Sequence, residues 1–342
     1  MRIGLDMSVA RTGGGSNIFS TYGLATKFTM PEYWVAGVQY SPLSTMPGYT
    51  FTRTGSQGAI DASSAVAFFA ANTPAINSAG YHAYDALTNN LLNAGGAGTL
   101  STQNVTTTAT PYTLAFIGTG TVTLSGTSTA GPLVGTGASN QVSLNFTPTA
   151  GTLTLTVTGS VTYAVLVGGS LTAPSVPIIA TAGATASIGT SALVVNDTLA
   201  DVDQLFMAKV TFTSNSGAGQ VVAENFLDGA NRFGWDQATN SVRGYWSNAG
   251  IFGTVYVAIT LGETVTLVNR RMSGQWRFGL IRAGALTWFQ AADTAPMVMA
   301  TKYTPGNYVS GNLPFLGRVH AGARKVGAFT TDQSVLDAAA VL

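Results

Sequence analysis

Residues 112–129 and 141–167 read YTLAFIGTGTVTLSGTST and QVSLNFTPTAGTLTLTVTGSVTYAVLV, and these two runs decide the fold class. In both runs apolar side chains occur at every second position, and threonine or serine fills many of the positions between them. Such alternation, broken by glycine-rich turns, is typical of antiparallel strands with one buried face. The runs therefore predict a β-sandwich. The alternating apolar residues are Tyr112, Leu114 and Phe116, then Val142, Leu144 and Phe146, then Leu153, Leu155 and Val157.

The same alternation returns in the last third of the chain and predicts a second sandwich over residues 205–342. Polar turns separate its apolar runs. The chain end predicts a short helix that begins near Asp332, with Thr330 or Thr331 as the N-cap. The apolar runs are Phe206, Ala208, Val210 and Phe212; Val255, Val257 and Ile259; Val265 and Leu267; and Trp276, Phe278 and Leu280.

These patterns together predict an all-β protein of consecutive antiparallel sandwiches with an irregular N-terminal region. Residues 1–95 mix aromatic residues with polar loops and are expected to dock on a neighbouring protein, with one brief helix near 62–71. Residues 96–172 form the predicted Thr/Gly-rich jelly roll. Residues 173–204, rich in proline and alanine at their start, are expected to be a linker.

Ionic side chains are scarce in this chain. Only 8% of its 342 residues are charged, the net charge is +1 and the mean hydropathy is +0.28. A typical soluble domain has roughly 25% charged residues. From residue 86 to residue 196 there is no charged residue and no histidine. We interpret this as a surface shared with other subunits, because self-repulsion is what keeps monomers apart. The alternative interpretation is that the protein is a β protein prone to non-specific association, without a surface built for other subunits.

Composition also argues against several classes of protein. There is no cysteine, so neither disulfides nor thiolate metal sites are expected. The most apolar windows, Val161–Val167 and Val176–Ala182, are too short to span a membrane. A near-zero net charge without a basic cluster argues against nucleic-acid binding. The N-terminus shows no secretory signal, and we expect synthesis in a cytoplasm.

The run TLSTQNVTTTATPYTLAFIGTGTVTLSGTSTAGPLVGTG (99–137), with the run from 141, resembles a carbohydrate-binding-type jelly roll found repeatedly in tailed-bacteriophage structural proteins. Segments similar to Phe51–Arg53, Ala65–Asn72 and Thr88–Asn93 often precede that module. A laminin-G or concanavalin-A-like sandwich often follows it, and Gly317–Val326 with Asp332–Ala339 resembles its ending. The sequence departs from the module at one place. The turn that usually follows the jelly roll contains an acidic residue, and the corresponding segment here, Val165–Gly169, has none.

The resemblance implies a virion component, such as a fibre, spike or head-decoration subunit, assembled in the host cytoplasm. Its partners would be other virion proteins of the capsid or tail. By analogy with phage fibres and spikes it would be a homotrimer. The first fifty residues match no known module, and in such proteins this end would dock on the particle.

The chain has no recognisable catalytic or cofactor motif, so neither an enzyme nor a cofactor is expected. Glu224 and Asp228 permit a glycosidase pair without indicating one. The acidic cluster Asp197, Asp201 and Asp203 permits a calcium site, but its spacing is not that of an EF-hand, and we favour a solvated loop. Each of the two histidines, His82 and His320, is expected to be structural rather than a metal ligand.

The best functional lead is a set of aromatic residues in the last domain. Flat aromatic faces beside polar groups suit sugar rings, although packing in the core is the default role of an aromatic side chain. Trp276 is expected to be core, because Phe278 and Leu280 share its strand face, and the phase of Trp235 with Phe233 also argues for the core. Tyr245 and Trp246 are adjacent, so they point to opposite faces of a strand and one of them is expected to be exposed. Trp288 belongs to the same aromatic set. The predicted glycan-binding residues are Arg232, Trp235, Asp236, Arg243, Tyr245 and Trp246.

Three functions therefore compete. The first is a virion surface protein whose outer sandwich binds host polysaccharide. The second is a purely architectural capsid or tail subunit without a ligand. The third is a glycan depolymerase acting through Glu224 and Asp228.

Overall fold

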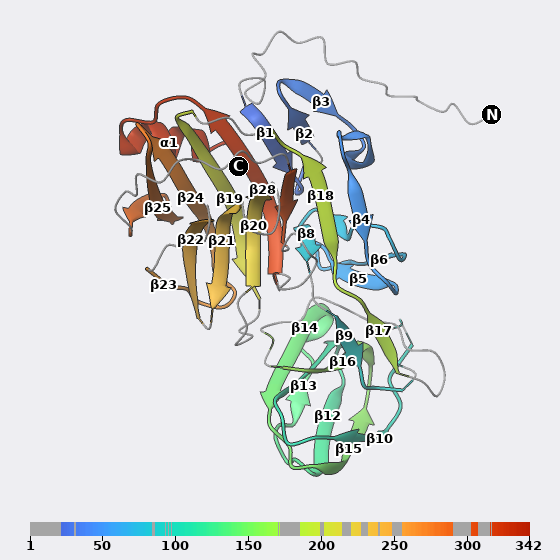
Figure 1. The fold of residues 1–342 in the computed structure, drawn as a ribbon. Helices are drawn as coiled ribbons and strands as arrows, with labels where there is room; N and C mark the ends of the chain where they lie inside the picture. The colour runs from blue at the N-terminus through green and yellow to red at the C-terminus, as the bar shows by residue number, and fades with distance from the viewer. Residues whose placement is uncertain are drawn as a thin grey trace, which may run out of the picture.

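The protein is almost entirely β-structure in the computed structural model, which confirms the predicted fold class. Its antiparallel sheets form a large sandwich and a small sandwich (Figure 1). The structure describes residues 22–30, 32–83, 86–92, 94, 96, 98–169, 171, 185–198, 202–213, 220–226, 232–238, 240–247, 255–289, 302–306, 315 and 317–342.

The large sandwich consists of a ten-stranded and a seven-stranded sheet. The ten-stranded sheet has the order β26-β25-β24-β19-β28-β1-β2-β3, and β8 also pairs with β28. Its strands are β1 (Tyr22–Lys27), β2 (Glu32–Val35), β3 (Val38–Tyr40), β7 (Ile76–Asn77), β8 (Gly80–Ala83), β19 (Gln204–Phe212), β24 (Thr264–Met272), β25 (Gln275–Arg282), β26 (Ala285–Trp288) and β28 (Gly317–Val326).

The seven-stranded sheet has the order β23-β22-β21-β20-β27-β18-β4. Its strands are β4 (Thr50–Thr52), β18 (Ala192–Asn196), β20 (Gln220–Phe226), β21 (Arg232–Ala238), β22 (Ser241–Ser247), β23 (Val257–Ala258) and β27 (Lys302–Pro305). A 3-10 turn, η2 (Leu43–Thr45), and the hairpin of β5 (Gln57–Ile60) and β6 (Val66–Phe69) accompany the N-terminal strands.

The small sandwich packs a four-stranded sheet, order β10-β15-β12-β13, on a three-stranded sheet, order β14-β11-β16. These strands contain the alternating runs from which a sandwich was predicted. They are β10 (Gln103–Thr107), β11 (Tyr112–Gly118), β12 (Thr121–Gly126), β13 (Leu133–Val134), β14 (Gly137–Phe146), β15 (Gly151–Thr158) and β16 (Val161–Gly168). The pair of β9 (Leu87–Asn89) and β17 (Ala186–Ile188) joins it to the rest of the chain.

The small sandwich is inserted into the large one rather than following a separate N-terminal region. Strands from before and after it pair with each other, β1 with β28 and β4 with β18. Within residues 22–83 the predicted irregular docking region is therefore part of the large sandwich. Within the predicted linker, β18 is a strand of the seven-stranded sheet. The predicted docking role of residues 1–21 lies outside the described residues.

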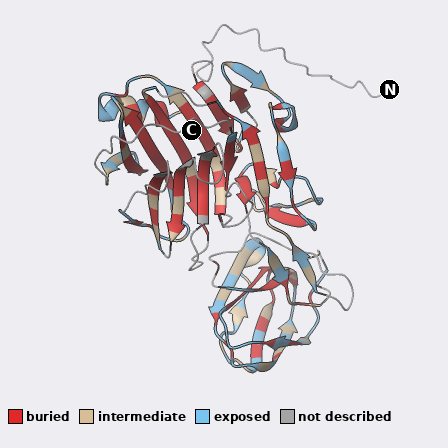
Figure 2. Cartoon of the chain, in the orientation of Figure 1, coloured by how far each residue is buried: buried red, intermediate tan, exposed pale blue. Residues whose placement is uncertain are grey.

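Each sandwich has its own apolar core. In the large sandwich Phe206 stacks on Trp235 with ring centroids 4.5 Å apart and meets Tyr303 edge-on at 5.7 Å. Figure 2 shows that β19, β24 and β28 are buried along most of their length. In the small sandwich β11 is buried on both faces, because Leu87 and Ala186 of the β9–β17 pair pack against its outer side.

The helix α1 (Asp332–Ala339) closes the outer face of the ten-stranded sheet. The Thr331 side chain accepts a hydrogen bond from the Ser334 amide at 3.2 Å, which confirms the predicted N-cap. Val335 and Ala338 pack against Leu205 of β19. Within the described parts of the chain, no helix has the length and apolar character needed to cross a membrane.

The brief helix predicted over residues 62–71 is wrong. Val66–Phe69 instead form strand β6, which pairs with β5 in the register Ala59↔Ala67. Alanine favours helix intrinsically, but tertiary context routinely overrides this preference, and here the pairing with β5 supplies backbone hydrogen bonds to the segment.

Candidate functional site

The hairpin of β21 and β22 sorts the predicted glycan-binding residues onto two faces of the seven-stranded sheet. In its register Trp235 pairs with Gly244, and Asp236 pairs with Arg243. Paired residues point to the same face and neighbours in a strand to opposite faces. Trp235 points inward, and a Cβ at Gly244 would lie 2.9 Å from the Phe278 ring, so Gly244 faces the core as well. Asp236 and Arg243 therefore lie on the outer face.

On this outer face Asp236 and Arg243 form a bidentate ion pair. Arg243 Nε donates to Asp236 Oδ1 at 2.8 Å, and Nη2 donates to Oδ2 at 3.0 Å. Burial alone would lower the pKa of Arg243, but the hydrogen bond and charge of Asp236 outweigh it, and the pKa is raised. The guanidinium is therefore a permanent, oriented cation with a flat fork of donors.

Tyr256 completes this outer-face group. The Arg243 guanidinium lies 4.6 Å from the centre of the Tyr256 ring, and the Tyr256 side chain is 42% exposed. Burial and the charge of Asp236 both raise the pKa of Tyr256, so its hydroxyl remains protonated at neutral pH. We call Asp236, Arg243 and Tyr256 the outer-face triad. It combines an exposed aromatic ring with a carboxylate and a guanidinium.

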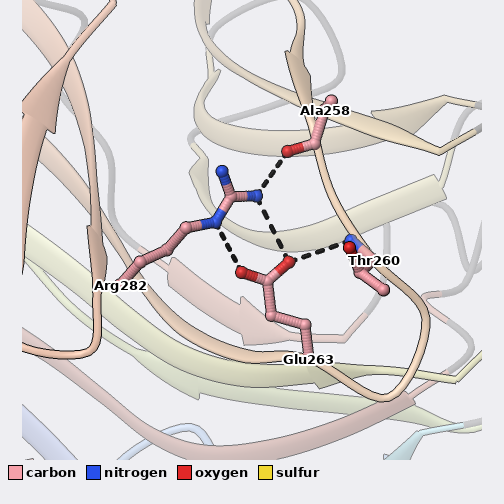
Figure 3. A network of polar contacts seen from close by, with 4 residues as sticks. All are labelled: Ala258, Thr260, Glu263 and Arg282. Atoms are coloured by element: carbon pink, nitrogen blue, oxygen red, sulfur yellow. Dashed lines mark hydrogen bonds and ion pairs between the residues drawn. The ribbon is translucent and has the colours of Figure 1, made fainter.

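A network at the edge of the sandwich holds the strand that follows Tyr256 (Figure 3). Arg282 donates through Nη2 to the Ala258 carbonyl and through Nε to Glu263 Oε1 at 2.5 Å. Glu263 Oε2 also accepts from the Thr260 amide at 2.9 Å. Because Arg282 belongs to the ten-stranded sheet and Ala258 to the seven-stranded sheet, the network ties the two sheets together beside the triad.

Tyr245 also lies on the outer-face side of the hairpin, but it is not available as a sugar platform. Its hydroxyl donates to Oε2 of Glu224, and Tyr245 is 2% exposed while Glu224 is fully buried. Glu224 pairs in register with Gly234 and Thr304, on the same face. This buried phenol–carboxylate contact fixes the position of Tyr245 and closes that part of the face.

The structure therefore corrects part of the predicted site. Trp235 and Tyr245 are buried, so neither presents a ring to a ligand; Trp235 is in the core because its strand phase aims it between the sheets. Asp236 and Arg243 do lie together at the surface. The side chains of Arg232 and Trp246 lie outside the described residues.

Tyr256 was missed by the sequence analysis, although a signal for it existed. Val257 and Ile259 alternate toward the core and are buried. The residue out of phase with them, Tyr256, had to point away from the core.

Trp276 and Trp288, two further aromatic residues of the predicted set, both have partners within the protein. Trp276 is 1% exposed, as expected for a core residue. Trp288 lies close to two cations, with the guanidinium groups of Arg270 and Arg277 each 4.8 Å from the centre of its ring. Its indole Nε1 donates to Asp332 at 2.8 Å. The Trp288 side chain therefore already has several partners within the protein.

The acidic residues considered for catalysis or calcium binding occupy other roles. Asp197 is not in a solvated loop: it is 1% exposed and ion-paired with Arg324 at 2.6 Å. Asp203 accepts from the Ser273 amide at 2.6 Å. Asp201 and Asp228 lie outside the described residues. Among the residues that the structure does describe, no group of three or more His, Cys, Asp and Glu side chains is placed to hold a metal ion.

The two histidines are close in space although far apart in sequence. Burial, then the charge of Arg318, lowers the pKa of His82 to about 3 and that of His320 to about 4. His82 Nε2 lies 3.1 Å from Asn77 Oδ1, and His320 Nε2 lies 2.7 Å from Thr211 Oγ1. Both side chains thus have polar partners within the protein.

No family model and no curated protein matches this chain. Solved structures match parts of it. Domain 4 of AbnA, a GH43 extracellular arabinanase from Geobacillus stearothermophilus in complex with arabinotriose, is 14% identical over 44% of this chain and 73% of that one, with a TM-score of 0.36. The Ruminococcus gnavus IT-sialidase CBM40 bound to α2,3-sialyllactose is 12% identical over 40% of this chain and 82% of that one, with a TM-score of 0.33.

The receptor-binding domain of botulinum neurotoxin D is a third such structure, 5% identical over 44% of this chain, with a TM-score of 0.36. The match spans 41% of the toxin domain's length. Two of these three structures hold a saccharide. At such identities and TM-scores the likenesses carry no argument about the ligand of this chain, so its function is argued from its own residues.

Proposed function

We propose that this chain is a non-enzymatic structural subunit of a bacteriophage virion and that its large sandwich binds a host surface glycan through the outer-face triad. The observation that carries the glycan proposal is the 42% exposed ring of Tyr256 beside the Asp236–Arg243 ion pair. The apolar C–H face of a sugar stacks on such a ring, as apolar groups do on aromatic side chains generally. The carboxylate and the guanidinium supply hydrogen-bond acceptors and donors for its hydroxyl groups.

The virion part of the proposal rests on the scarcity of charge and on exposed apolar side chains. Val38 lies on the edge strand β3 and is 54% exposed, and Val134 of the small sandwich is 52% exposed. Open edge strands and apolar side chains favour pairing with other chains. We therefore propose that the protein forms a homo-oligomer of three subunits, which assembles in the host cytoplasm and is incorporated into the particle.

Glycan binding is tested with purified full-length protein on an array of bacterial surface polysaccharides. Tyr256→Ala removes the ring and is expected to weaken binding at least tenfold. The matched control is Phe68→Ala, which removes another exposed aromatic ring (40% exposed) from β6. Absence of any glycan signal from the wild type, or full binding by Tyr256→Ala, would overturn the glycan proposal.

Virion incorporation is tested separately by electron microscopy of particles labelled with an antibody against the large sandwich. Labelled particles support the proposal and also show whether the protein lies on the head or the tail. Labelled particles combined with a blank glycan array would instead favour the architectural subunit. Light scattering of the purified protein measures the oligomeric state, and a monodisperse monomer would contradict the assembly model.

A further inference from the structure

A polar cleft lies where the small sandwich meets the large one, away from the residues of the outer-face triad. Its volume is about 510 Å³, within the range of small-molecule sites. Ser139, Asn140 and Gln141 at the start of β14 line one side of it. Asp61, from the β5–β6 turn, and Arg318 of β28 also line it. Thr213 and Gly262 complete the lining, so five segments distant in sequence build this cleft.

Arg318 is the unusual member of the cleft. Its side chain is partly buried, and its Nε is shielded from solvent yet has no hydrogen-bond acceptor among the residues that the structure describes. Within the same residues no carboxylate forms an ion pair with it: Asp61 lines the cleft but is not within ion-pair distance. A buried donor or cation without a partner is costly. The wall of the cleft thus holds a guanidinium without a counter-charge among the described residues, and the Nε of this group has no hydrogen-bond partner there.

The groups next to Arg318 do not neutralise it. His82 is its register partner in β8, and His320 lies two residues further along β28 on the same face. Burial and the charge of Arg318 keep both imidazoles neutral at pH 7. An oxyanion that enters the cleft would meet the two terminal Nη groups of Arg318, which are not among the shielded atoms and carry donors that match a carboxylate in charge and geometry.

The rest of the cleft favours hydroxyl groups rather than a bare anion. Ser139 and Asn140 are exposed at its rim and offer a hydroxyl and an amide. Asp61 Oδ1 already accepts from the Ser63 amide at 2.8 Å and the Ala65 amide at 2.9 Å, so it is held rigidly. Its position at the wall suits it to accept from ligand hydroxyl groups. The negative charge of Asp61 also disfavours a ligand that carries several negative charges, because like charges repel.

We propose that this cleft binds a sugar acid, with the ligand carboxylate on Arg318 and the ligand hydroxyl groups on Asp61, Ser139 and Asn140. The ligand is either a free monosaccharide acid or one unit of an acidic polysaccharide. The proposal does not depend on the outer-face triad, because the two sites share no residue.

The test is calorimetric titration of the full-length protein with galacturonate, with galactose as the uncharged match and acetate as the bare carboxylate. Galacturonate is expected to bind at least tenfold more tightly than either. Titration with a trigalacturonate separates the two sources: tighter binding than the monomer indicates a polysaccharide unit, and exclusion indicates a free sugar acid. Equal binding of galacturonate and galactose, or of galacturonate and acetate, would overturn the proposal.

Two variants locate the binding. Arg318→Gln is expected to abolish the preference for galacturonate over galactose, and circular dichroism checks that it folds. Asn140→Ala changes an exposed residue at the rim, so this variant is expected to fold normally. It should lower the affinity for galacturonate about threefold or more. Val326→Ala, at an exposed position at the other end of β28, should leave the affinity unchanged. If Asn140→Ala and a folded Arg318→Gln both bind like the wild type, the cleft is not the site.

Discussion

Asp197 and Arg324 form an ion pair inside the large sandwich, between strands of opposite sheets. Arg324 Nη2 lies 2.6 Å from Asp197 Oδ1, and Nε lies 3.0 Å from Oδ2. The side chains are 5% and 0% exposed. A chain with so few charges places one pair where water is absent. At such a site the loss of one partner costs more than the pair contributes.

We expect Asp197→Asn to lower the free energy of unfolding of the large sandwich by about 3–5 kcal/mol, because it leaves Arg324 buried without a counter-charge. Urea denaturation followed by tryptophan fluorescence measures this, since none of the five tryptophans lies between residues 86 and 196. The control is Asp236→Asn, whose ion pair is partly exposed and should contribute less than about 1 kcal/mol. Equal losses in the two variants would contradict this account.

His82 and His320 predict a loss of stability in mild acid. Their pKa values in the folded protein, about 3 and about 4, lie below the unfolded value of about 6.5. The unfolded chain therefore takes up protons first. The contribution of the two histidines to the free energy of unfolding is therefore fully present above pH ~6.5. It is lost as the pH falls toward their pKa values in the folded protein, by about 2 kcal/mol for each histidine at pH 5.

The measurement compares urea denaturation at pH 7 and pH 5 for the wild type and His82→Gln. The variant should lose about half as much stability over this interval, whatever its stability at pH 7, because one of the two titrating groups is gone. An unchanged difference between the two pH values would show that His82 is not responsible.

At the scale of single elements, the cap of helix α1 is a local feature with a measurable effect. Thr331→Ala removes the hydrogen bond to the Ser334 amide and should lower the free energy of unfolding by about 1 kcal/mol. Thr330→Ala, an exposed neighbour, is the matched control and should have little effect. Equal effects of the two variants in urea denaturation would argue against Thr331 as the cap.

The Arg282–Glu263 network should stabilise strand β23 more than the whole protein. Its side chains are 39% and 20% exposed, so Arg282→Ala should cost less than about 1 kcal/mol in global stability. Amide hydrogen exchange of residues 255–260 should nevertheless become faster, because the contact to the Ala258 carbonyl is lost. Unchanged exchange in this segment would contradict the role assigned to the network.

Elements whose signal is local were predictable from the sequence. The strands containing Tyr112–Phe116 and Leu153–Val157 and the C-terminal helix form where alternation and capping residues indicated them. Strand β6 was not predictable in this way, because the alanines of residues 62–71 favour helix locally and the strand forms by pairing with β5. The burial of β11 on both faces likewise depends on residues 87 and 186, from beyond the two ends of the small sandwich.

At the scale of the whole molecule, the insertion of the small sandwich determines which fragments can fold. Residues 86–171 retain the core of the small sandwich. Residues 186–342 lack β1, β2, β3, β7 and β8 of one sheet and β4 of the other. Leu24, Tyr33 and Phe51 would then be missing from the shared core.

We therefore expect the fragment 86–171 to fold by itself and the fragment 186–342 to be unfolded or aggregated. Circular dichroism and limited proteolysis of the two purified fragments provide the measurement. Co-expression of residues 1–85 with 186–342 should restore the buried-tryptophan fluorescence of the large sandwich. A folded, monomeric 186–342 fragment would show that the N-terminal strands are dispensable.

Of the predicted site, only Asp236 and Arg243 are found together and partly exposed. Their opposite charges at matching hairpin positions were visible in the sequence. Their partner Tyr256 lies just before β23, beyond the hairpin, and its contact with Arg243 depends on the edge pairing of β23 with β22. The cleft around Arg318 was not predicted, because its lining residues come from the small sandwich and from four separate segments of the large-sandwich part of the chain, which only the tertiary structure brings together.

The sequence by itself determined the all-β class, the phase of most strands and the capped C-terminal helix, because alternation and capping act over a few neighbouring residues. Only the tertiary structure decided that β1 lies beside β28 and that β18 joins the seven-stranded sheet. Backbone hydrogen bonds between strands are the same for every residue type except proline, so they carry no record of the partner. The choice of partner depends on which apolar faces close the core together.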